Sequence, residues 1–264
     1  MTQPNKAEKA ARFLFEAHRD RQPYQPLPDD ISPATIEEAY DMQEAFQSLL
    51  APERGAIVGY KIALTTPVMQ RMVGFDAPCA GAVFESRVHH SPASVNASDY
   101  VRLGAECEVA VRLQSGLPAS GAPYGREAVA AAVGALMPAF ELVDDRGADY
   151  SNLYFLGVAA DNAWNAGVVL GPERADWQTL DLENASGAMT INGEPAGEGY
   201  GRDVLGHPLD ALAWLVNTLA GRGKELQAGM LVMTGSIVST KFLNPGDEAA
   251  FTFEGLGDIR LSVG

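Results

Sequence analysis

The alternation of apolar and polar side chains is clearest between residues 101 and 113, in the run VRLGAECEVAVRL. Every second residue from Val101 to Leu113 is apolar, whereas Glu106 and Glu108 occupy positions between them. A period of two predicts a β-strand with one core-facing side and with both glutamates on the opposite side. Because residues two apart in a strand are separated by roughly 6.5 to 7 Å, both carboxylates can reach a single ion.

Short β-rich segments, separated by glycine and proline turns, continue from about residue 55 onward. Two helices are expected to interrupt them, at residues 125–140 and 207–223. Many short strands with few helices favour a sandwich or barrel-like β core over a doubly wound parallel sheet. The other strands are expected within residues 56–66, 81–90, 165–171, 188–193, 229–240 and 248–263.

The first fifty residues have a helical period instead. Apolar residues recur at helical spacing from Ala10, and a second helix is expected around Thr35 and Glu38, which have capping-box spacing. We therefore expect an α+β protein with two parts. An N-terminal helical cap would span residues 1–54, and a β-rich catalytic domain would span residues 55–264.

Composition limits the partners of this chain. Its 264 residues are 47% hydrophobic, as in ordinary folded soluble proteins, and its formal net charge is −15. Such an acidic surface argues against binding nucleic acid or anionic membranes. The first twenty residues contain no signal-peptide apolar segment, and no run of about 18 apolar residues predicts a membrane span. We expect a cytoplasmic enzyme.

A third glutamate changes the meaning of the first two. Glu141 lies in the apolar run ALMPAFELV, so we expect it to be buried, where an unpaired carboxylate is unfavourable. A divalent cation shared with Glu106 and Glu108 would resolve this conflict, and an all-carboxylate ligand set favours Mg²⁺, Mn²⁺ or Ca²⁺. Two alternatives stay open: Glu106 and Glu108 are simply solvated, or Glu141 pairs with an arginine or lysine.

Lys61 is the second candidate for chemistry. It lies within the hydrophobic segment VGYKIALTT, where a lysine is either paired, functional, or extended along a strand edge toward water. A functional Lys61 could polarise a carbonyl, hold a carboxylate or transfer a proton.

Polar residues at the ends of apolar segments are candidates for substrate binding. Asp161 and Asn162 lie between apolar segments, although a buried Asp-Asn pair more often bonds backbone groups. Thr234, Gly235 and Ser236 lie in VMTGSIVST at a strand end, where hydroxyl and backbone groups commonly meet a ligand.

Several of these segments together resemble a known family. The matching motifs are GYKIALTT, the E-x-E strand, PAFELVDD, ADNAWNAG, LGHPLDALAWL and VMTGSIVSTKFLNPGD. They resemble the 2-oxopent-4-enoate hydratase and 4-oxalocrotonate decarboxylase family of the fumarylacetoacetase-like superfamily. The resemblance runs from about residue 35 to the end of the chain, with the motifs in the same order.

The resemblance implies a fold, a site and a substrate class. The fold would be a mixed β-sandwich or roll core with an N-terminal helical part. Mg²⁺ or Mn²⁺ would bind Glu106, Glu108 and Glu141, and Lys61 would match the active-site lysine. The substrate would be a small 2-oxo or 2-hydroxydienoic acid from the catabolism of aromatic compounds. A homo-oligomer is implied, and so is association with a related enzyme of the same pathway.

One segment departs from the family pattern. The family usually reads G-x-D-x-P-D, whereas this chain reads GFDAPCAG, with Asp76 at the first aspartate position and Cys79 at the second. We take Asp76 and Cys79 as candidate catalytic residues beside Lys61. Hydration of a 2-hydroxyalka-2,4-dienoate is the predicted reaction. The alternatives are decarboxylation of a vinylogous 2-oxo diacid and a catalytically silent homologue that supports a partner enzyme.

Overall fold

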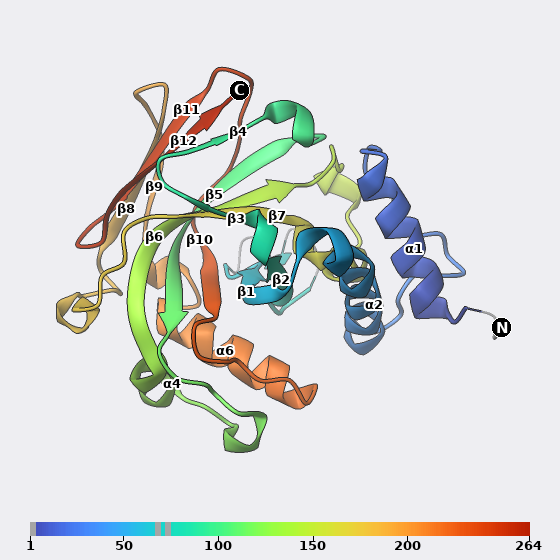
Figure 1. Ribbon diagram of the computed structural model, residues 1–264, viewed down its shortest axis with the longest axis horizontal. Coiled ribbons are helices and arrows are strands. Elements are labelled where there is room, and N and C mark those ends of the chain that lie inside the picture. The colour runs from blue at the N-terminus through green and yellow to red at the C-terminus, as the bar shows by residue number, and fades with distance from the viewer. Residues whose placement is uncertain (1–3, 67–69, 72–74) are drawn as a thin grey trace.

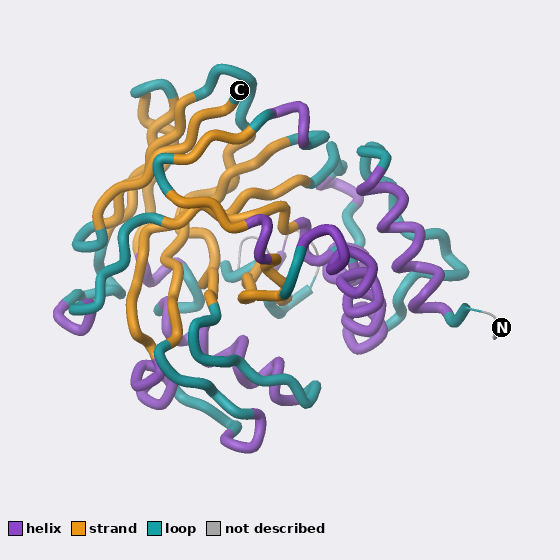
Figure 2. Tube along the Cα trace, viewed as in Figure 1, coloured by secondary structure: helices purple, strands orange, loops and turns teal. Residues whose placement is uncertain are grey.

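The computed structural model describes residues 4–66, 70–71 and 75–264, and within these ranges the chain forms two β-sheets flanked by helices (Figures 1 and 2). The larger sheet is mixed, because β1–β10 and β3–β7 are parallel pairs and the others are antiparallel. Its seven strands lie in the order β2 (Cys79–Phe84), β1 (Ile57–Ala63), β10 (Leu231–Phe242), β5 (Leu103–Leu113), β6 (Val133–Asp144), β7 (Asn165–Leu170) and β3 (Val88–His90).

The smaller sheet packs against one face of the larger one. Strands β11 and β12 lie against β6 and β7, and Phe140 of β6 meets Phe251 of β11 with ring centroids 6.2 Å apart. This apolar layer makes the core of a sandwich. The five strands lie in the order β4 (Ala93–Val95), β12 (Gly257–Val263), β11 (Glu248–Phe253), β8 (Ser186–Ile191) and β9 (Glu194–Tyr200). The predicted α+β class with a mixed β core is confirmed.

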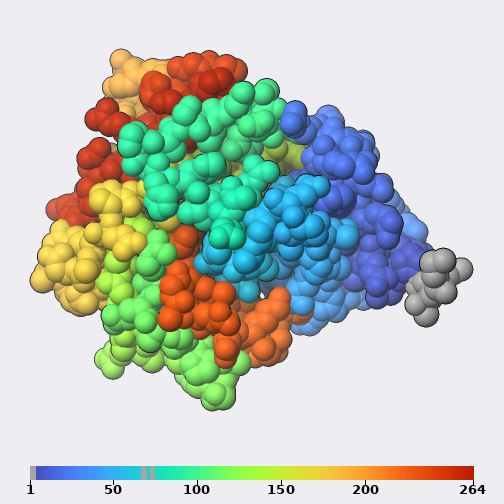
Figure 3. Space-filling model, viewed as in Figure 1, coloured from blue at the N-terminus to red at the C-terminus, as the bar shows by residue number. Residues whose placement is uncertain are grey.

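The two N-terminal helices form one end of the molecule (Figure 1). Helix α1 (Lys6–Arg19) begins at a capping box made by Asn5 and Glu8, and α2 (Ile36–Arg54) begins where the Thr35 hydroxyl accepts the Glu38 amide. On the face seen in Figure 3, this blue segment packs beside the teal segment around β3 and β4.

The helical end shares its core with the sheets. Leu14 of α1 and Phe46 of α2 are buried in the same hydrophobic cluster as Val232 of the central strand β10. The division into residues 1–54 and 55–264 therefore stays a prediction, because the core is continuous across it.

The helix expected over residues 125–140 is wrong beyond Ala132. Helix α4 (Arg126–Ala132) ends there, and the chain continues directly as strand β6. Strand β6 is buried on both faces, so its apolar run lacks the alternation that distinguishes a strand from a buried helix.

The second expected helix is confirmed as α6 (Pro208–Gly221), which packs against β10 and α4. His207 is its N-cap and accepts the Leu209 amide at 3.0 Å. Among the described residues, no helix combines the length and the apolar character needed to cross a bilayer.

Candidate active site

Three carboxylates converge at the middle of the larger sheet. Glu106 and Glu108 lie two residues apart on β5, and Glu141 on the neighbouring β6 is the register partner of Glu106. Each of the three offers one oxygen, and these oxygens all lie within 4.8 Å of one another. The structure thus brings together the three glutamates that the sequence analysis grouped.

Glu108 is anchored from strand β10. Its Oε2 accepts the backbone amide of Gly235 at 2.7 Å. Gly235 has φ +116°, and a Cβ at this position would lie 2.4 Å from the Thr65 side chain. Only glycine fits this backbone without strain, so the residue type at position 235 helps to fix the direction of the Glu108 carboxylate.

The other two carboxylates are held by side chains. Thr240 of β10 donates its hydroxyl hydrogen to Oε1 of Glu106. Asn165, the first residue of β7, donates from Nδ2 to Oε1 of Glu141 at 2.9 Å. These supporting hydrogen bonds orient the carboxylates, as second-layer groups do around metal ligands.

The oxygens that remain fit a cation. Glu108 and Glu141 are both fully buried, and their other oxygens, Oε1 and Oε2 respectively, have no hydrogen-bond partner among the described residues. Buried carboxylate oxygens without a partner are costly. A hard divalent ion is the partner that such a set of oxygen ligands fits.

The protonation of the carboxylates reflects the same crowding. Burial raises the pKa of Glu108 well above its usual value, and the nearby charges of Glu141 and Glu106 raise it further. Burial also raises the pKa of Glu141, although Lys61 opposes this. Without a cation the three groups cannot all be ionised at low cost, and a bound divalent ion would reverse that preference.

Lys61 is paired with one of these glutamates. Its Nζ lies 3.1 Å from Oε1 of Glu141, and the lysine is 1% exposed. Burial lowers the pKa of Lys61, but the charges of Glu141 and Glu106 outweigh burial and leave that pKa above its ordinary value. Lys61 is therefore a protonated donor beside the carboxylates, and the solvated strand-edge alternative is excluded.

A cavity of ≈ 260 Å³ adjoins this cluster. Lys61, Glu106 and Ser236 supply polar groups to its wall. Most of the remaining wall is apolar and includes Ile62, Val143, Leu153, Val158 and Trp164. A small molecule with one polar end and one apolar end matches this lining.

Two predicted catalytic residues lie away from the cavity wall. Asp76 is exposed and is not among the described residues that line the cavity. Cys79 is fully buried in β2, and burial raises the pKa of its thiol to about 12. A protonated thiol is not a general base at neutral pH. The catalytic roles of both residues stay predictions without a contact that supports them.

Asp161 and Asn162 bond to protein groups. Asp161 is 1% exposed and pairs with Arg146 and with His18 Nε2, the latter at 2.6 Å. Asn162 bonds the backbone of Ala82 through both its amide oxygen and its amide nitrogen, at 2.7 and 3.0 Å. Neither lines the cavity, so their predicted substrate contacts are not supported by the geometry.

These two residues hold a turn instead. Residues Asn162–Trp164 form η5, and all three have left-handed φ angles between 47° and 59°. Such backbone is strained for residues other than glycine. The bonds of Asn162 to β2 stabilise the turn, which places Trp164 against the cavity.

The three residues of the predicted Thr234–Ser236 segment have different roles in the structure. The Thr234 hydroxyl is buried and donates to the Val109 carbonyl at 2.8 Å, so it supports the sheet. Gly235 anchors Glu108, and only Ser236 lines the cavity. Asn165 and Thr240 were not predicted as site residues, because their roles depend on the register between strands, although Asn165 lies inside the motif ADNAWNAG.

Comparison with known proteins agrees with the fold and identifies the family. The model of the fumarylacetoacetate (FAA) hydrolase C-terminal family matches residues 80–264. The 2-hydroxyhexa-2,4-dienoate hydratase of Comamonas testosteroni is 33% identical over 256 residues, which is 96% of each chain. The 2-keto-4-pentenoate hydratase of Paraburkholderia xenovorans is 32% identical over 257 residues, covering 97% of this chain and 94% of the relative.

A solved structure extends the likeness to the whole fold. The 4-oxalocrotonate decarboxylase from Pseudomonas putida G7, complexed with magnesium and adipate, superposes with a TM-score of 0.91 at 26% identity and covers 100% of this chain and 99% of its own. The mixed sheets and the carboxylate cluster define the class of protein. The chain belongs to the fumarylacetoacetate hydrolase C-terminal family, within its hydratase and decarboxylase group, which confirms the resemblance noted from the motifs.

Proposed function

We propose that this protein is a divalent-metal-dependent lyase that hydrates a 2-hydroxyalka-2,4-dienoate, equivalent to a 2-oxopent-4-enoate, in the catabolism of aromatic compounds. The observation that carries this proposal is the contrast within the cavity wall. Protonated Lys61 and Glu106, a member of the carboxylate cluster, line the cavity, and most of the rest of its wall is apolar. A substrate with a 2-oxo acid group and a hydrocarbon tail fits both parts of this lining.

Glu106, Glu108 and Glu141 would hold the cation, Mg²⁺ or Mn²⁺ with Ca²⁺ as a further candidate. When bound, such a cation supplies Lewis acidity to the oxygens of a 2-oxo acid. The magnesium and calcium in the related decarboxylase structures support this choice. The Gly235 amide and the Asn165 side chain keep the ligand oxygens in place, so little reorganisation is needed on binding.

Lys61 would act on the substrate directly. Lys61 lines the cavity, and its ammonium group has three donors, of which one is directed at Glu141. The others can hold the substrate carboxylate or deliver the proton that converts a dienol to its ketone. The apolar residues around the tail would exclude bulk water from the ion pair and strengthen these interactions.

Decarboxylation of a 2-oxo diacid is the second candidate, because the related decarboxylase structure holds adipate, a dicarboxylate. A second substrate carboxylate needs a cation at the far end of the cavity. Arg102 is bonded to Asp145, Arg146 is bonded to Asp161, and neither lines the cavity. Lys61 is the one lysine or arginine among the described lining residues, which favours hydration.

A direct assay separates the candidates. Purified protein with Mg²⁺ is mixed with enzymatically generated 2-hydroxypenta-2,4-dienoate, and ultraviolet absorbance follows loss of the dienol. The proposal expects metal-dependent loss with formation of a hydrated 2-oxo acid. Carbon dioxide release from 2-oxohex-3-enedioate, without turnover of the dienol, would support the decarboxylase instead. Turnover of neither by metal-bound protein would support a silent homologue that assists a partner enzyme.

The setting of the enzyme is part of the same proposal. The acidic surface and the metabolic substrate agree with a cytoplasmic location. Assembly as a homo-oligomer and association with a related enzyme of the pathway are the further parts, and sedimentation of the purified protein alone and with that enzyme tests both.

A further inference from the structure

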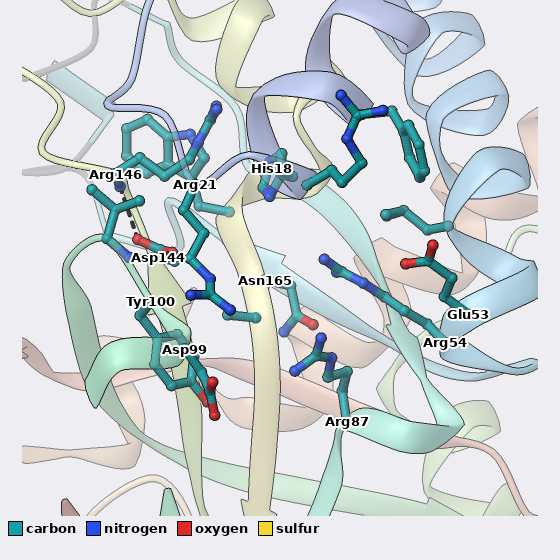
Figure 4. Close-up of a pocket in the computed structure, with 16 residues that line it drawn as sticks. His18, Arg21, Glu53, Arg54, Arg87, Asp99, Tyr100, Asp144, Arg146 and Asn165 are labelled. Atoms are coloured by element: carbon teal, nitrogen blue, oxygen red, sulfur yellow. Dashed lines mark hydrogen bonds between the residues drawn. The ribbon is translucent and has the colours of Figure 1, made fainter. Parts of the chain in front are cut away.

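A second and larger cavity lies between the N-terminal helices and the main sheet. Its volume is ≈ 380 Å³, and Trp164 lines both cavities. Segments that are distant in the sequence contribute to its wall. They are the turn after α1, the end of α2, the short helix η1 (Glu85–Arg87) and the start of β7. Figure 4 shows the guanidinium groups of Arg21, Arg54 and Arg87 pointing into it around Asn165.

The lining of this cavity is unusually rich in arginine for so acidic a protein. Five arginines and three acidic residues line it, and the charges balance only when Asp20 and Asp161, which pair with Arg19 and Arg146 from outside the lining, are counted, whereas the whole chain carries −15. An acidic protein has many carboxylates with which its arginines can pair. A surplus of arginine in one concave place therefore calls for an explanation.

Three of the arginines have no carboxylate partner. Arg21, Arg54 and Arg87 make no side-chain hydrogen bond or ion pair with any described residue, and the Nε of Arg87 is buried without an acceptor. The other two are occupied, because Arg19 pairs with Asp20 and Arg146 pairs with Asp161.

The acidic residues of the wall do not neutralise them. Asp144 already accepts the backbone amides of Val101, Arg102 and Arg146 at 2.9 to 3.1 Å. The remaining two, Glu53 and Asp99, are exposed to solvent and make no ion pair with a described residue.

Arg54 and Arg87 also repel each other. Burial, and after it the charge of Arg87, lower the pKa of Arg54 to about 10, against weaker opposition from Glu53. Two guanidiniums that repel each other, are partly out of water and make no ion pair with a described residue weaken the fold. An anion between them would relieve the repulsion and satisfy the free donors.

We propose that this cavity is a binding site for a small dianion, a phosphate or dicarboxylate group, held between Arg54 and Arg87 with Arg21 at the entrance. The planar guanidinium presents paired donors that match either group. The site is distinct from the proposed active site, because Lys61 and Glu106 line the other cavity and none of the three glutamates lines this one. It does not depend on the reaction proposed above.

The test compares two double variants of the Mg²⁺-loaded protein. Arg54→Gln/Arg87→Gln removes the proposed donors. Arg126→Gln/Arg260→Gln is the matched control, because it makes the same change of net charge at exposed positions outside the cavity. Melting temperature and calorimetric titration are measured with sodium phosphate, with sodium succinate, and with sodium chloride at equal ionic strength.

The expected result is specific for the cavity. Phosphate or succinate should raise the melting temperature of the wild type and of the control beyond the effect of sodium chloride. In Arg54→Gln/Arg87→Gln the affinity should fall about tenfold or more, since charge-assisted hydrogen bonds are lost. In sodium chloride this variant should be as stable as the wild type or more so. The anion that binds with the higher affinity shows whether the site prefers a phosphate or a dicarboxylate.

Four outcomes overturn the proposal. One is an equal response of the wild type to all three salts, and another is an unchanged affinity in Arg54→Gln/Arg87→Gln. The third is loss of the oligomer in that variant, seen by sedimentation, which would mean that acidic residues of a second copy fill the cavity. If the variant unfolds in sodium chloride, the two arginines are structural and the anion site is likewise refuted.

Discussion

Glu106 on β5 and Glu141 on β6 face each other directly across an antiparallel strand pair, in the centre of the larger sheet. Like charges at directly opposed positions destabilise a sheet, and here Glu108 adds a third carboxylate within reach. Lys61 supplies one compensating positive charge. The remaining negative charge is the feature that a divalent ion would neutralise, and it makes the cluster sensitive to substitution in opposite ways with and without metal.

Replacing Glu108 by glutamine should therefore have two opposite effects. In metal-free protein it removes a buried carboxyl whose ionisation is opposed by burial and by Glu141 and Glu106, and which the fold must either keep charged or protonate at a cost, so the free energy of unfolding should rise by about 1 to 3 kcal/mol. The stabilisation that Mg²⁺ or Mn²⁺ gives the wild type should disappear. Urea unfolding with and without metal measures both effects.

An exposed glutamate provides the control for this experiment. Glu198 on β9 is exposed and makes no ion pair among the described residues, so Glu198→Gln should leave metal affinity and stability nearly unchanged. Full metal affinity in the Glu108→Gln protein would remove Glu108 from the ligand set.

Substitution of Lys61 by methionine should destabilise the metal-free protein. It leaves Glu141 buried without its positive partner, and breaking a buried pair in this way costs about 3 to 5 kcal/mol. The double variant Lys61→Met/Glu141→Gln removes both charges and should recover much of that loss. Turnover of the dienol should be lost in both proteins.

The two readouts separate structure from catalysis. Recovery of stability together with recovery of activity in the double variant would show that Lys61 acts only as the counter-charge of Glu141. Because Glu141→Gln itself removes a proposed metal ligand, a direct role of the lysine is tested in the single variant: loss of turnover by Lys61→Met protein that keeps the Mn²⁺ affinity of the wild type would support it.

Gly235→Ala tests the anchoring of Glu108. A methyl group would lie 2.4 Å from the Thr65 side chain on a backbone with φ +116°, so a loss of about 1 to 3 kcal/mol is expected from strain. Metal affinity should also fall about tenfold, because the amide that orients Glu108 moves. Calorimetric titration with Mn²⁺ measures this.

Gly193 offers a matched control for the strain. It has φ +82° in the turn between β8 and β9, and a Cβ there would meet no atom within 4 Å. Gly193→Ala should cost stability without changing metal affinity. A similar loss of affinity in both variants would disconnect the Gly235 amide from the metal site.

Asp161→Asn should make the free energy of unfolding less dependent on pH in the acidic range. Burial opposes ionisation of Asp161, but Arg146 and His18 outweigh it and hold its pKa below the ordinary value. A carboxyl with a lowered pKa in the folded state stabilises the protein above the unfolded pKa of roughly 4, and this stabilisation is lost as pH falls through the lower folded value. The wild type should therefore lose stability below about pH 4.

The Asp161→Asn variant should differ from the wild type in stability both at neutral pH and at acidic pH. At neutral pH it leaves Arg146 buried without its carboxylate, which costs about 3 to 5 kcal/mol. Below pH 4 its stability should fall less steeply than that of the wild type. Urea unfolding from about pH 3 to about pH 7 checks this, with the exposed Asp258→Asn as control. Parallel curves for wild type and Asp161→Asn would contradict the proposed linkage.

The periodicity of apolar residues predicted much of the secondary structure. The prediction was wrong where a segment is apolar throughout and has no period. Strand β5 alternates and is predicted from its sequence, including the side on which Glu106 and Glu108 lie. Strand β6 is apolar throughout, so residues up to Phe140 read as a continuation of helix α4. Burial on both faces, which comes from the neighbouring strands and the second sheet, is a tertiary property that this run does not encode in a period.

The site was predictable for the residues that are unusual in their own segment. A glutamate or lysine within an apolar run, such as Glu141 or Lys61, is conspicuous in the sequence. Asn165 and Thr240 are ordinary polar residues whose function depends on which glutamate the strand register brings opposite them. The arginine-lined cavity was not predicted, because its side chains come from separate segments that only the fold brings together.

The carboxylate cluster depends on strands that are distant in the chain. Its ligands lie on β5 and β6, whereas the groups that orient them come from β1, β7 and β10, so the cluster spans residues 61 to 240. An unfolded chain cannot present this arrangement, and an ion that binds it binds the native state alone. The midpoint of thermal unfolding should therefore rise in proportion to the logarithm of free metal concentration once the ion is in excess, which turns the ion into a reporter of the assembled sheet.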